Sequence, residues 1–160
     1  MRRQQDDWTG LPLEQRQAWA GFLRAHAAIT RELDTELVAR HGLPLSSYDV
    51  LIQLQLAGGQ MRMSRLAEAV VLSRSGLSRL VDRLERDGLV RRRASQGARQ
   101  TFATLTGKGR AKLAECTPAH LSGVRRRFLD RLSAEELAQL AVIWKQLLGF
   151  DPLQLDRADL

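Results

Sequence analysis

The stretch Met63–Thr106, MSRLAEAVVLSRSGLSRLVDRLERDGLVRRRASQGARQTFATLT, decides the fold of this chain. Its first half has apolar residues at the spacing of helices. This predicts one helix over about 65–70 and a second that begins after Ser73 and ends at Asp87-Gly88. The second helix has an apolar face opposite a polar, basic one. The residues predicted to be buried on that apolar face are Leu77, Leu80, Val81 and Leu84.

The second half of the stretch predicts a β-hairpin. Residues 89–94 and 99–106 are predicted to be its two strands, with a glycine-containing turn between them, and in the second strand Thr101, Ala103 and Leu105 alternate with Phe102 and Thr104. Alternation places Arg92 on the opposite face of its strand from Arg91 and Arg93. Two helices joined by a short turn and followed by a hairpin are the pattern of a winged helix-turn-helix, in which the hairpin is the wing.

The positive charge of the chain is concentrated in the same region. The 160 residues carry a formal net charge of +7. Residues 62–110 hold 12 basic and 4 acidic residues, a net charge of +8, whereas the remainder holds 13 basic and 14 acidic residues. An ordinary solvated surface would spread its charge more evenly. A basic patch of this kind favours a polyanion partner, of which nucleic acid is the commonest.

A long amphipathic helix is predicted before this stretch, over residues 13–40. Apolar side chains recur in steps of three and four from Trp19 to Leu37, and Gly42 is suited to end the helix. A helix of about 28 residues is long for a small domain and favours contact with a partner chain.

Serine residues mark the expected starts of the next three helices, because a serine hydroxyl can accept a hydrogen bond from the first helical turn. Ser46 or Ser47 is predicted to cap the helix that carries Tyr48. Ser64 and Ser73 are predicted to cap the two helices that follow it.

Two further helices are predicted after the hairpin, over residues 107–149. Pro118 lies inside the first and predicts a kink or interruption just before it, since proline donates no backbone hydrogen bond. Ser133 and Glu136 have the spacing of a capping box at the start of the second. The apolar stripe from Leu137 to Leu148 is close to a coiled-coil seam and fits self-association.

These features predict a mostly α-helical fold with a small β-hairpin wing, in one domain over residues 13–150. Residues 61–106 form the winged helix-turn-helix within it. The flanking segments 13–41 and 107–149 form a helical dimerisation part. The ends of the chain are expected to be frayed or disordered before residue 13 and a loose polar tail over 151–160.

The polar face of the helix after Ser73 suits the major groove of DNA, where arginine can read guanine through two hydrogen bonds. Gly76 lowers the helix propensity of the first turn but would let DNA come close to the backbone. Arginines of the hairpin suit phosphate or minor-groove contacts, with Arg99 at the tip as the candidate for groove insertion. The candidate DNA contacts are Ser64, Arg65, Ser73, Arg74, Ser75, Gly76, Ser78, Arg79, Arg83, Arg91, Arg93 and Arg99.

No catalytic or metal-binding pattern is present in the sequence. His26, His41 and His120 lack metal-ligand spacing with one another and with Cys116, and no phosphate-binding glycine loop or nucleophile motif occurs. We therefore expect no enzyme activity, no metal and no cofactor. Cys116 lies on an apolar helix stripe and is predicted to be a buried, inert thiol. A single cysteine favours a reduced compartment, and no apolar run is long enough for a membrane span, so a cytoplasmic location is expected.

The run RMSRLAEAVVLSRSGLSRLVDRLERDGLVRR, the hairpin after it and the motif LTGKGRAKL resemble the MarR family of bacterial and archaeal transcriptional regulators. The resemblance covers the chain from about Ala18 to Leu148. It implies a homodimer joined through its first, fifth and sixth helices and bound to a palindromic operator. It also implies release by a small, often aromatic or phenolic, ligand held between the DNA-binding and dimerisation parts.

Two features depart from what the resemblance implies. The family's wing commonly carries Asp-x-Arg, whereas Gly97-Ala98-Arg99 keeps the arginine without its bracing aspartate, which predicts a more mobile wing. The cysteine of peroxide-sensing members, near the start of the first helix, has no counterpart here, which argues against that subgroup.

The resemblance also nominates ligand contacts. Trp19, His26, Tyr48 and Asp49 lie on the elements that line the family's pocket, although core packing or capping is the plainer role for each. We predict a sequence-specific transcriptional regulator, a homodimeric repressor relieved by a small ligand. The alternatives are an architectural or general DNA-binding protein without an effector, and a winged-helix module that binds other proteins.

Overall fold

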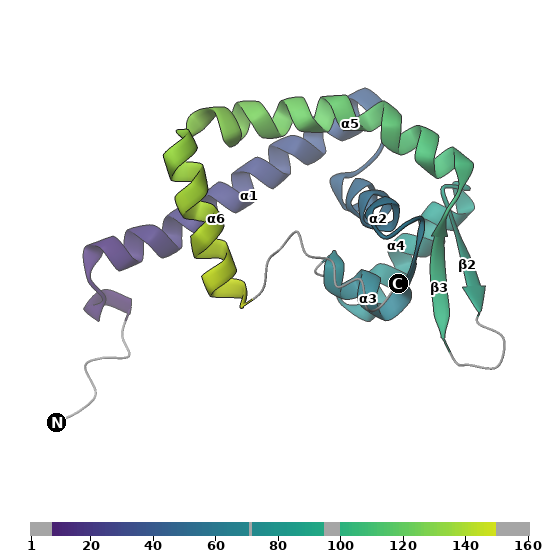
Figure 1. Cartoon of the computed structure of the whole chain (residues 1–160), viewed down its shortest axis with the longest axis horizontal. Helices are drawn as coiled ribbons and strands as arrows, with labels where there is room; N and C mark the ends of the chain where they lie inside the picture. The colour runs from purple at the N-terminus through teal and green to yellow at the C-terminus, as the bar shows by residue number, and fades with distance from the viewer. Residues whose placement is uncertain (1–7, 71, 95–99, 150–160) are drawn as a thin grey trace.

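A computed structural model of the chain describes residues 8–70, 72–94 and 100–149 (Figure 1). This part of the chain is mostly helical and has one small antiparallel sheet, as predicted. The elements in order are η1 (Trp8–Gly10), α1 (Leu13–His41), α2 (Leu45–Leu56), β1 (Gln60–Arg62), α3 (Met63–Ala69), α4 (Arg74–Arg86), β2 (Val90–Ala94), β3 (Thr101–Leu105), α5 (Gly107–Arg127), η2 (Leu129–Arg131) and α6 (Ala134–Leu148).

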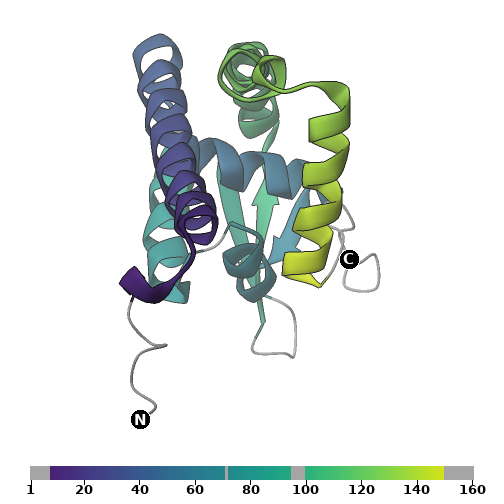
Figure 2. The same ribbon diagram turned by 90° about the vertical axis from the view of Figure 1, so that its left-hand side faces the viewer.

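The long helices α1 and α5 lie side by side along one edge of the molecule, as Figures 1 and 2 show. Helices α2, α3 and α4 and the sheet gather below one end of this pair, while α6 hangs from the other end of α5. None of the described helices is long and apolar enough to cross a membrane. The predictions for residues 1–7, for the hairpin turn at 95–98 and for the C-terminal tail concern segments outside the described residues.

The core is one cluster of buried side chains that joins the helix-turn-helix to α2 and α5. All four residues predicted for the buried face of α4 lie in it, together with Leu51 and Leu54 of α2 and Leu113 of α5. Cys116 of α5 is also fully buried there, as predicted, and burial raises the pKa of its thiol. A thiol with a raised pKa is poorly ionised and therefore unreactive.

The sheet has a third strand that the hairpin prediction did not include. Strand β1 pairs with β3, so the order is β1-β3-β2 and the winged unit begins at Gln60. The third strand explains Phe102, for which the hairpin alone offers no cover. Arg62 of β1 is the cross-strand partner of Phe102, and its guanidinium lies 5.8 Å from the ring centroid.

Two predicted serine caps are wrong. Helix α2 begins at Leu45, before both Ser46 and Ser47, and the Asp34 carboxylate of α1 accepts a hydrogen bond from the Leu45 N–H at 2.8 Å. Helix α3 begins at Met63 with Arg62 at the cap position, so Ser64 lies inside its first turn.

Other predicted boundaries are confirmed. Gly42 ends α1 with a left-handed φ of 63°, and Ser133 forms the predicted capping box with Glu136 at the start of α6. Of the kink or interruption predicted near Pro118, the interruption is wrong, because α5 runs from Gly107 to Arg127 without a break. Pro118 and Ala114, whose carbonyl loses its helical partner, are both exposed, so water can bind that carbonyl.

Three residues join the start of α5 to the turn between α4 and β2. The Thr106 hydroxyl accepts a hydrogen bond from the Gly109 N–H at 2.9 Å and donates to the Gly88 carbonyl at 2.7 Å. A Cβ on Gly109 would lie 2.1 Å from the Leu89 carbonyl oxygen, so only glycine allows this approach. Lys108 donates to the Asp87 carbonyl at 2.7 Å. We call these contacts the Thr106 joint.

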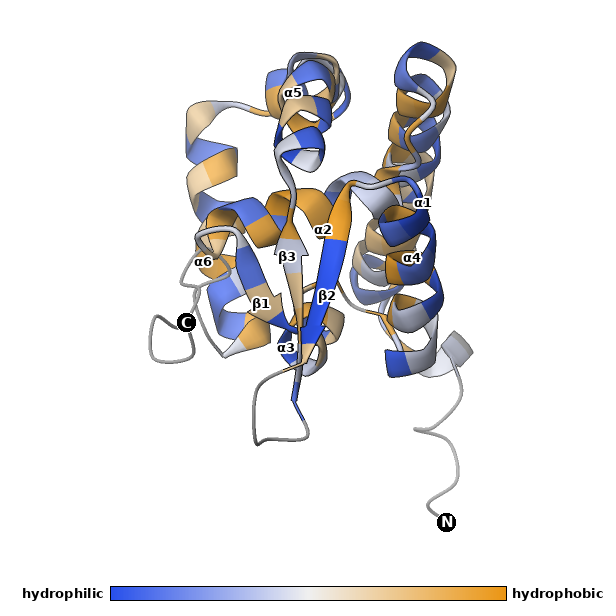
Figure 3. Cartoon of the chain, turned by 90° about the vertical axis from the view of Figure 1, so that its right-hand side faces the viewer, coloured by the Kyte–Doolittle hydropathy of each residue, from blue (hydrophilic) through white to orange (hydrophobic). Residues whose placement is uncertain are grey.

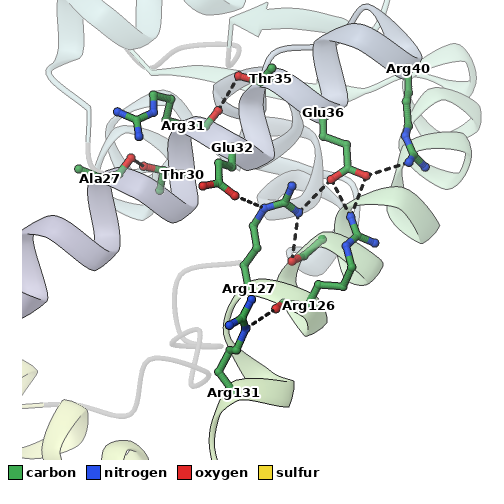
Figure 4. A network of polar contacts seen from close by, with 11 residues as sticks. Ala27, Thr30, Arg31, Glu32, Thr35, Glu36, Arg40, Arg126, Arg127 and Arg131 are labelled. Carbon is green, nitrogen blue, oxygen red and sulfur yellow. Dashed lines mark hydrogen bonds and ion pairs between the residues drawn. The ribbon is translucent and has the colours of Figure 1, made fainter.

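Ion pairs join the other end of α5 to α1 (Figure 4). Arg127 donates to Glu32 at 2.8 Å and to Glu36 at 2.9 Å, and Arg126 binds both oxygens of Glu36. Burial alone would raise the pKa of Glu36, but hydrogen bonds from the two arginines outweigh it and lower that pKa. A Cβ on Gly123 would lie 2.6 Å from Leu33, which shows how closely the two helices approach.

Candidate nucleic-acid interface

Helix α4 presents the polar face that the sequence predicts. Ser73 caps it, with its Oγ accepting a hydrogen bond from the Gly76 N–H at 3.1 Å. The apolar face lies in the core, whereas Arg74, Ser75 and Arg79 are exposed. The helix therefore has an anchored side and a free, basic side, which is the arrangement needed to enter a groove of DNA.

A groove of about 490 Å³ lies between the starts of α3 and α4 and the sheet. It brings together three predicted DNA contacts, Ser64 of α3 with Arg74 and Ser78 of α4. The residues that line it are Met63, Ser64, Arg74, Leu77, Ser78, Arg92 and Thr101. Its polar lining is made of hydroxyl and guanidinium groups, which suit anionic oxygen atoms.

The remaining predicted contacts on the helices have different surroundings. Arg65 is exposed and donates to Glu68 at 3.0 Å within α3. Arg83 is exposed in the last turn of α4. The Ser73 hydroxyl is occupied as a cap and lies 3.3 Å from the Ser75 hydroxyl, so its first role is to begin the helix.

The outer face of the sheet carries a row of arginines. Arg91 and Arg93 of β2 are exposed, and strand pairing puts Arg62 on the same face through Phe102. Figure 3 shows β2 as the most hydrophilic of the three strands. Arg99, predicted for the wing tip, lies outside the described residues.

Arg92 points the other way, toward α4, as the alternation of β2 predicts. It forms an ion pair with Asp82, and its guanidinium also donates to Ser78. Its backbone N–H donates to Glu85 at 2.9 Å. These contacts of Arg92 with α4 were not predicted from the sequence. The available signal was the pair of acids on α4, Asp82 and Glu85, inside an otherwise basic segment.

The four candidate ligand contacts fall into two separate places. The Tyr48 ring of α2 lies against the His120 ring of α5 in a tilted arrangement, with ring centroids 4.3 Å apart, and its hydroxyl lies 3.4 Å from that of Thr117. Trp19 and His26 of α1 instead flank Phe22, whose ring also meets Trp144 of α6.

Burial shifts the pKa values of two groups in the first of these places, around Tyr48. It raises the pKa of Asp49, beside Tyr48 in the sequence, to about 6, and it lowers the pKa of His120. The Nδ1 atom of His120 is buried without a hydrogen-bond partner among the described residues. In the same part of the chain, no group of three or more histidine, cysteine, aspartate or glutamate side chains could hold a metal ion.

The fold and the basic face of α4 define a winged helix-turn-helix protein of the DNA-binding class. Comparison with known proteins identifies the family. The sequence model of the MarR family matches residues 41–100. AbsC, a MarR family transcriptional regulator from Streptomyces coelicolor, is 34% identical, with a TM-score of 0.80 over 87% of this chain and 95% of AbsC.

Two further relatives agree. Sco3205, a MarR family regulator from Streptomyces coelicolor solved in complex with DNA, is 32% identical, with a TM-score of 0.79 over 86% of this chain and 88% of that one. An uncharacterised HTH-type transcriptional regulator from Bacillus cereus is 32% identical over 67% of this chain and 71% of the relative. The chain therefore belongs to the MarR family of DNA-binding transcriptional regulators, which are not enzymes.

Proposed function

We propose that the protein is a sequence-specific repressor that binds a palindromic operator as a homodimer, with one α4 in the major groove of each half-site. The exposed, Ser73-capped start of α4 carries the proposal, because Arg74 and Arg79 are free to read base edges there. The similarity to Sco3205, which was solved in complex with DNA, supports DNA binding. Half-sites one helical turn apart, about 10 bp from centre to centre, would fit such a dimer.

Selection of bound duplexes from a random pool, followed by binding measurements on single-base variants, tests this role. Arg74→Ala or Arg79→Ala should weaken binding and relax the preference for one base pair by about 1–3 kcal/mol. Arg91→Ala and Arg99→Ala should weaken binding to every duplex alike, because phosphate contacts carry no sequence information. If all four variants lose the same affinity on every sequence, the division into base-reading and phosphate-binding arginines is wrong.

The homodimer proposal rests on α6, a mainly apolar helix with no buried residue in the single chain. Val142 is 65% exposed and Leu147 is 70% exposed, and the first half of α1 adds Trp19, Phe22 and Leu23. Apolar surface of this extent favours a partner. We propose that a second copy of the chain covers this apolar surface. The length of α1 supports this, because the helix is longer than it needs to be to pack against the winged helix-turn-helix of its own chain.

Light scattering of the pure protein tests the dimer. Leu147→Glu should shift the mass from dimer toward monomer, because it places a charge in the apolar contact. Gln55→Glu adds the same charge at an exposed position of α2, outside α1 and α6, and is the matched control. A wild-type monomer at micromolar concentration would contradict the homodimer and favour a role as a protein-interaction module.

We also propose that a small aromatic ligand relieves repression by binding beside Tyr48 and Asp49, between α2 and α5. The contact between the Tyr48 and His120 rings and the buried, unpaired His120 nitrogen support this place, because they combine aromatic groups with a polar atom that a ligand could satisfy. A thermal-shift screen with aromatic acids tests the proposal. A shift abolished by Tyr48→Phe supports it, whereas one abolished by Trp19→Gln alone would move the site to α1.

The competing view is a general DNA-binding protein without an effector. It predicts equal affinity for selected and random duplexes, and no thermal shift with any member of the screen. The comparison of duplex affinities and the thermal-shift screen therefore distinguish the ligand-controlled repressor from the general DNA-binding protein.

A further inference from the structure

We propose that Arg92 is a specificity-determining residue that never touches a base: it holds Ser78 of α4 so that the serine hydroxyl acts as a hydrogen-bond donor toward DNA. This inference rests on the proposed function, because it assumes that α4 reads the major groove. It assigns Arg92 a role distinct from those of Arg91 and Arg93 on the same strand.

The contacts of the Arg92 side chain carry the proposal. Its Nη2 atom donates to the Ser78 carbonyl oxygen at 2.7 Å and to the Ser78 Oγ at 3.1 Å. Its Nη1 atom forms the ion pair with Asp82. Only 25% of the Arg92 side chain is exposed, and its guanidinium is bound to α4 at the edge of the groove.

The backbone of β2 fixes the same residue from the other side. Glu85 accepts the Arg92 N–H at 2.9 Å and so satisfies a donor on an edge strand. Ser78, Asp82 and Glu85 are spaced by four and three residues, which puts them on one face of α4. The strand and the helix are therefore held together along about two helical turns.

The charge of Arg92 decides which way the Ser78 hydroxyl proton points. A guanidinium only donates hydrogen bonds, so Ser78 Oγ must accept from it. The positive charge repels the hydroxyl proton, which turns away from the Arg92 guanidinium while Ser78 remains on the wall of the groove that it lines with Ser64 and Arg74. Ser78 is thereby presented as a donor.

A donor at this position distinguishes base pairs. In the major groove it can bind guanine N7 or O6, adenine N7 or thymine O4. The amino groups of cytosine and adenine are themselves donors, and a serine proton that points toward them is repelled. Arg92 thus gives Ser78 a preference that the serine alone, free to rotate, would lack.

The test compares base preferences of full-length variants on the selected duplex and its single-base variants. Ser78→Ala should reduce the preference at one base pair by about 3- to 10-fold, the effect of one hydrogen bond. Arg92→Gln should reduce the preference at the same pair, and the double variant should lose no more than Ser78→Ala alone. Arg92→Lys cannot satisfy Ser78 and Asp82 together and should rescue only part of the preference.

Arg91→Gln is the matched control, because it removes an arginine from the opposite face of the same strand. It should lower affinity for every duplex by one common factor. Circular dichroism and thermal melting establish that each variant is folded. If Arg92→Gln is not, Asp82→Asn serves instead, since it removes the anchor but keeps the arginine.

Three outcomes would overturn the inference. Arg92→Gln could lower affinity uniformly, as Arg91→Gln does; Ser78→Ala could leave every base preference unchanged; or the two effects could fall on different base pairs. A wild-type protein with no base preference at all would instead contradict the proposed function. The failure of the inference and that of the function are therefore distinguishable.

Discussion

Asp49 is a carboxyl group whose burial opposes ionisation. Because burial raises its pKa from 3.8 to about 6, the folded state holds this proton more tightly than the unfolded state. The favourable contribution is complete below pH 3.8 and is lost as the pH rises through 6. Asp49→Asn should therefore raise the free energy of unfolding at pH 7.5 by up to about 3 kcal/mol. Urea denaturation should show this gain shrinking toward zero near pH 3.5; a gain independent of pH would show that ionisation is not its cause.

Gly109 and Gly107 form a natural pair for a test of close packing. A Cβ on Gly109 would meet the Leu89 carbonyl, whereas one on Gly107 would meet nothing within 4 Å. Gly109→Ala should cost about 1–3 kcal/mol, because the backbone must shift. Gly107→Ala should be neutral or slightly stabilising. Chemical denaturation measures both, and equal effects would show that the approach of α5 to Leu89 relaxes freely.

At the scale of elements, the contact between α1 and α5 depends on Arg127. Arg127→Met should reduce the free energy of unfolding by about 1 kcal/mol at pH 7. Since the pKa of Glu36 is lowered by its arginine partners, its contribution is present above 4.5 and is lost as the pH falls through the lowered folded value. The difference from wild type should therefore shrink below pH 4. Arg125→Met, which removes an arginine that forms no ion pair with a described residue, should show little change at either pH.

The order and type of the helices follow from sequence, since apolar spacing depends on the chain itself. The buried face of α4, the Ser73 cap and the inward side of β2 were all predicted correctly. The start of α2 was not, because its first N–H is bound by Asp34, eleven residues earlier on another helix. Strand β1 was likewise missed as a sheet member, because its partner lies 40 residues away at the Arg62–Phe102 pair.

The candidate DNA-binding site was likewise predicted only in part from the sequence. Residue type and helical periodicity predicted the exposed face of α4, and the charge count located it. The link from Arg92 to Ser78 and Asp82 depends on how β2 packs against α4, which no local pattern contains. The predicted ligand contacts were drawn from whole elements, so the separation of Trp19 from Tyr48 became visible only when the helices were placed.

At the scale of the whole molecule, salt dependence reports how many phosphates the protein contacts. If each subunit of a dimer neutralises four phosphates, about eight counterions are released and the slope of log K against log salt is about −7. Fluorescence anisotropy over roughly 50–300 mM salt measures that slope. A slope near −1 would contradict binding through the basic region. Arg91→Gln should make the dimer slope shallower by about 2, one contact per subunit.

The Thr106 joint also has a thermodynamic consequence. Hydrogen bonds there cross from the turn after α4 to the first turn of α5, and the main core continues through Leu113. The DNA-reading unit and the long helices are therefore one cooperative body, which should melt in a single calorimetric transition. Amide protons of α4 and of α5 should then exchange through the same global opening. A small molecule bound only between α2 and α5 would slow exchange in α4 as well, because its binding energy is added to the stability of the whole unit.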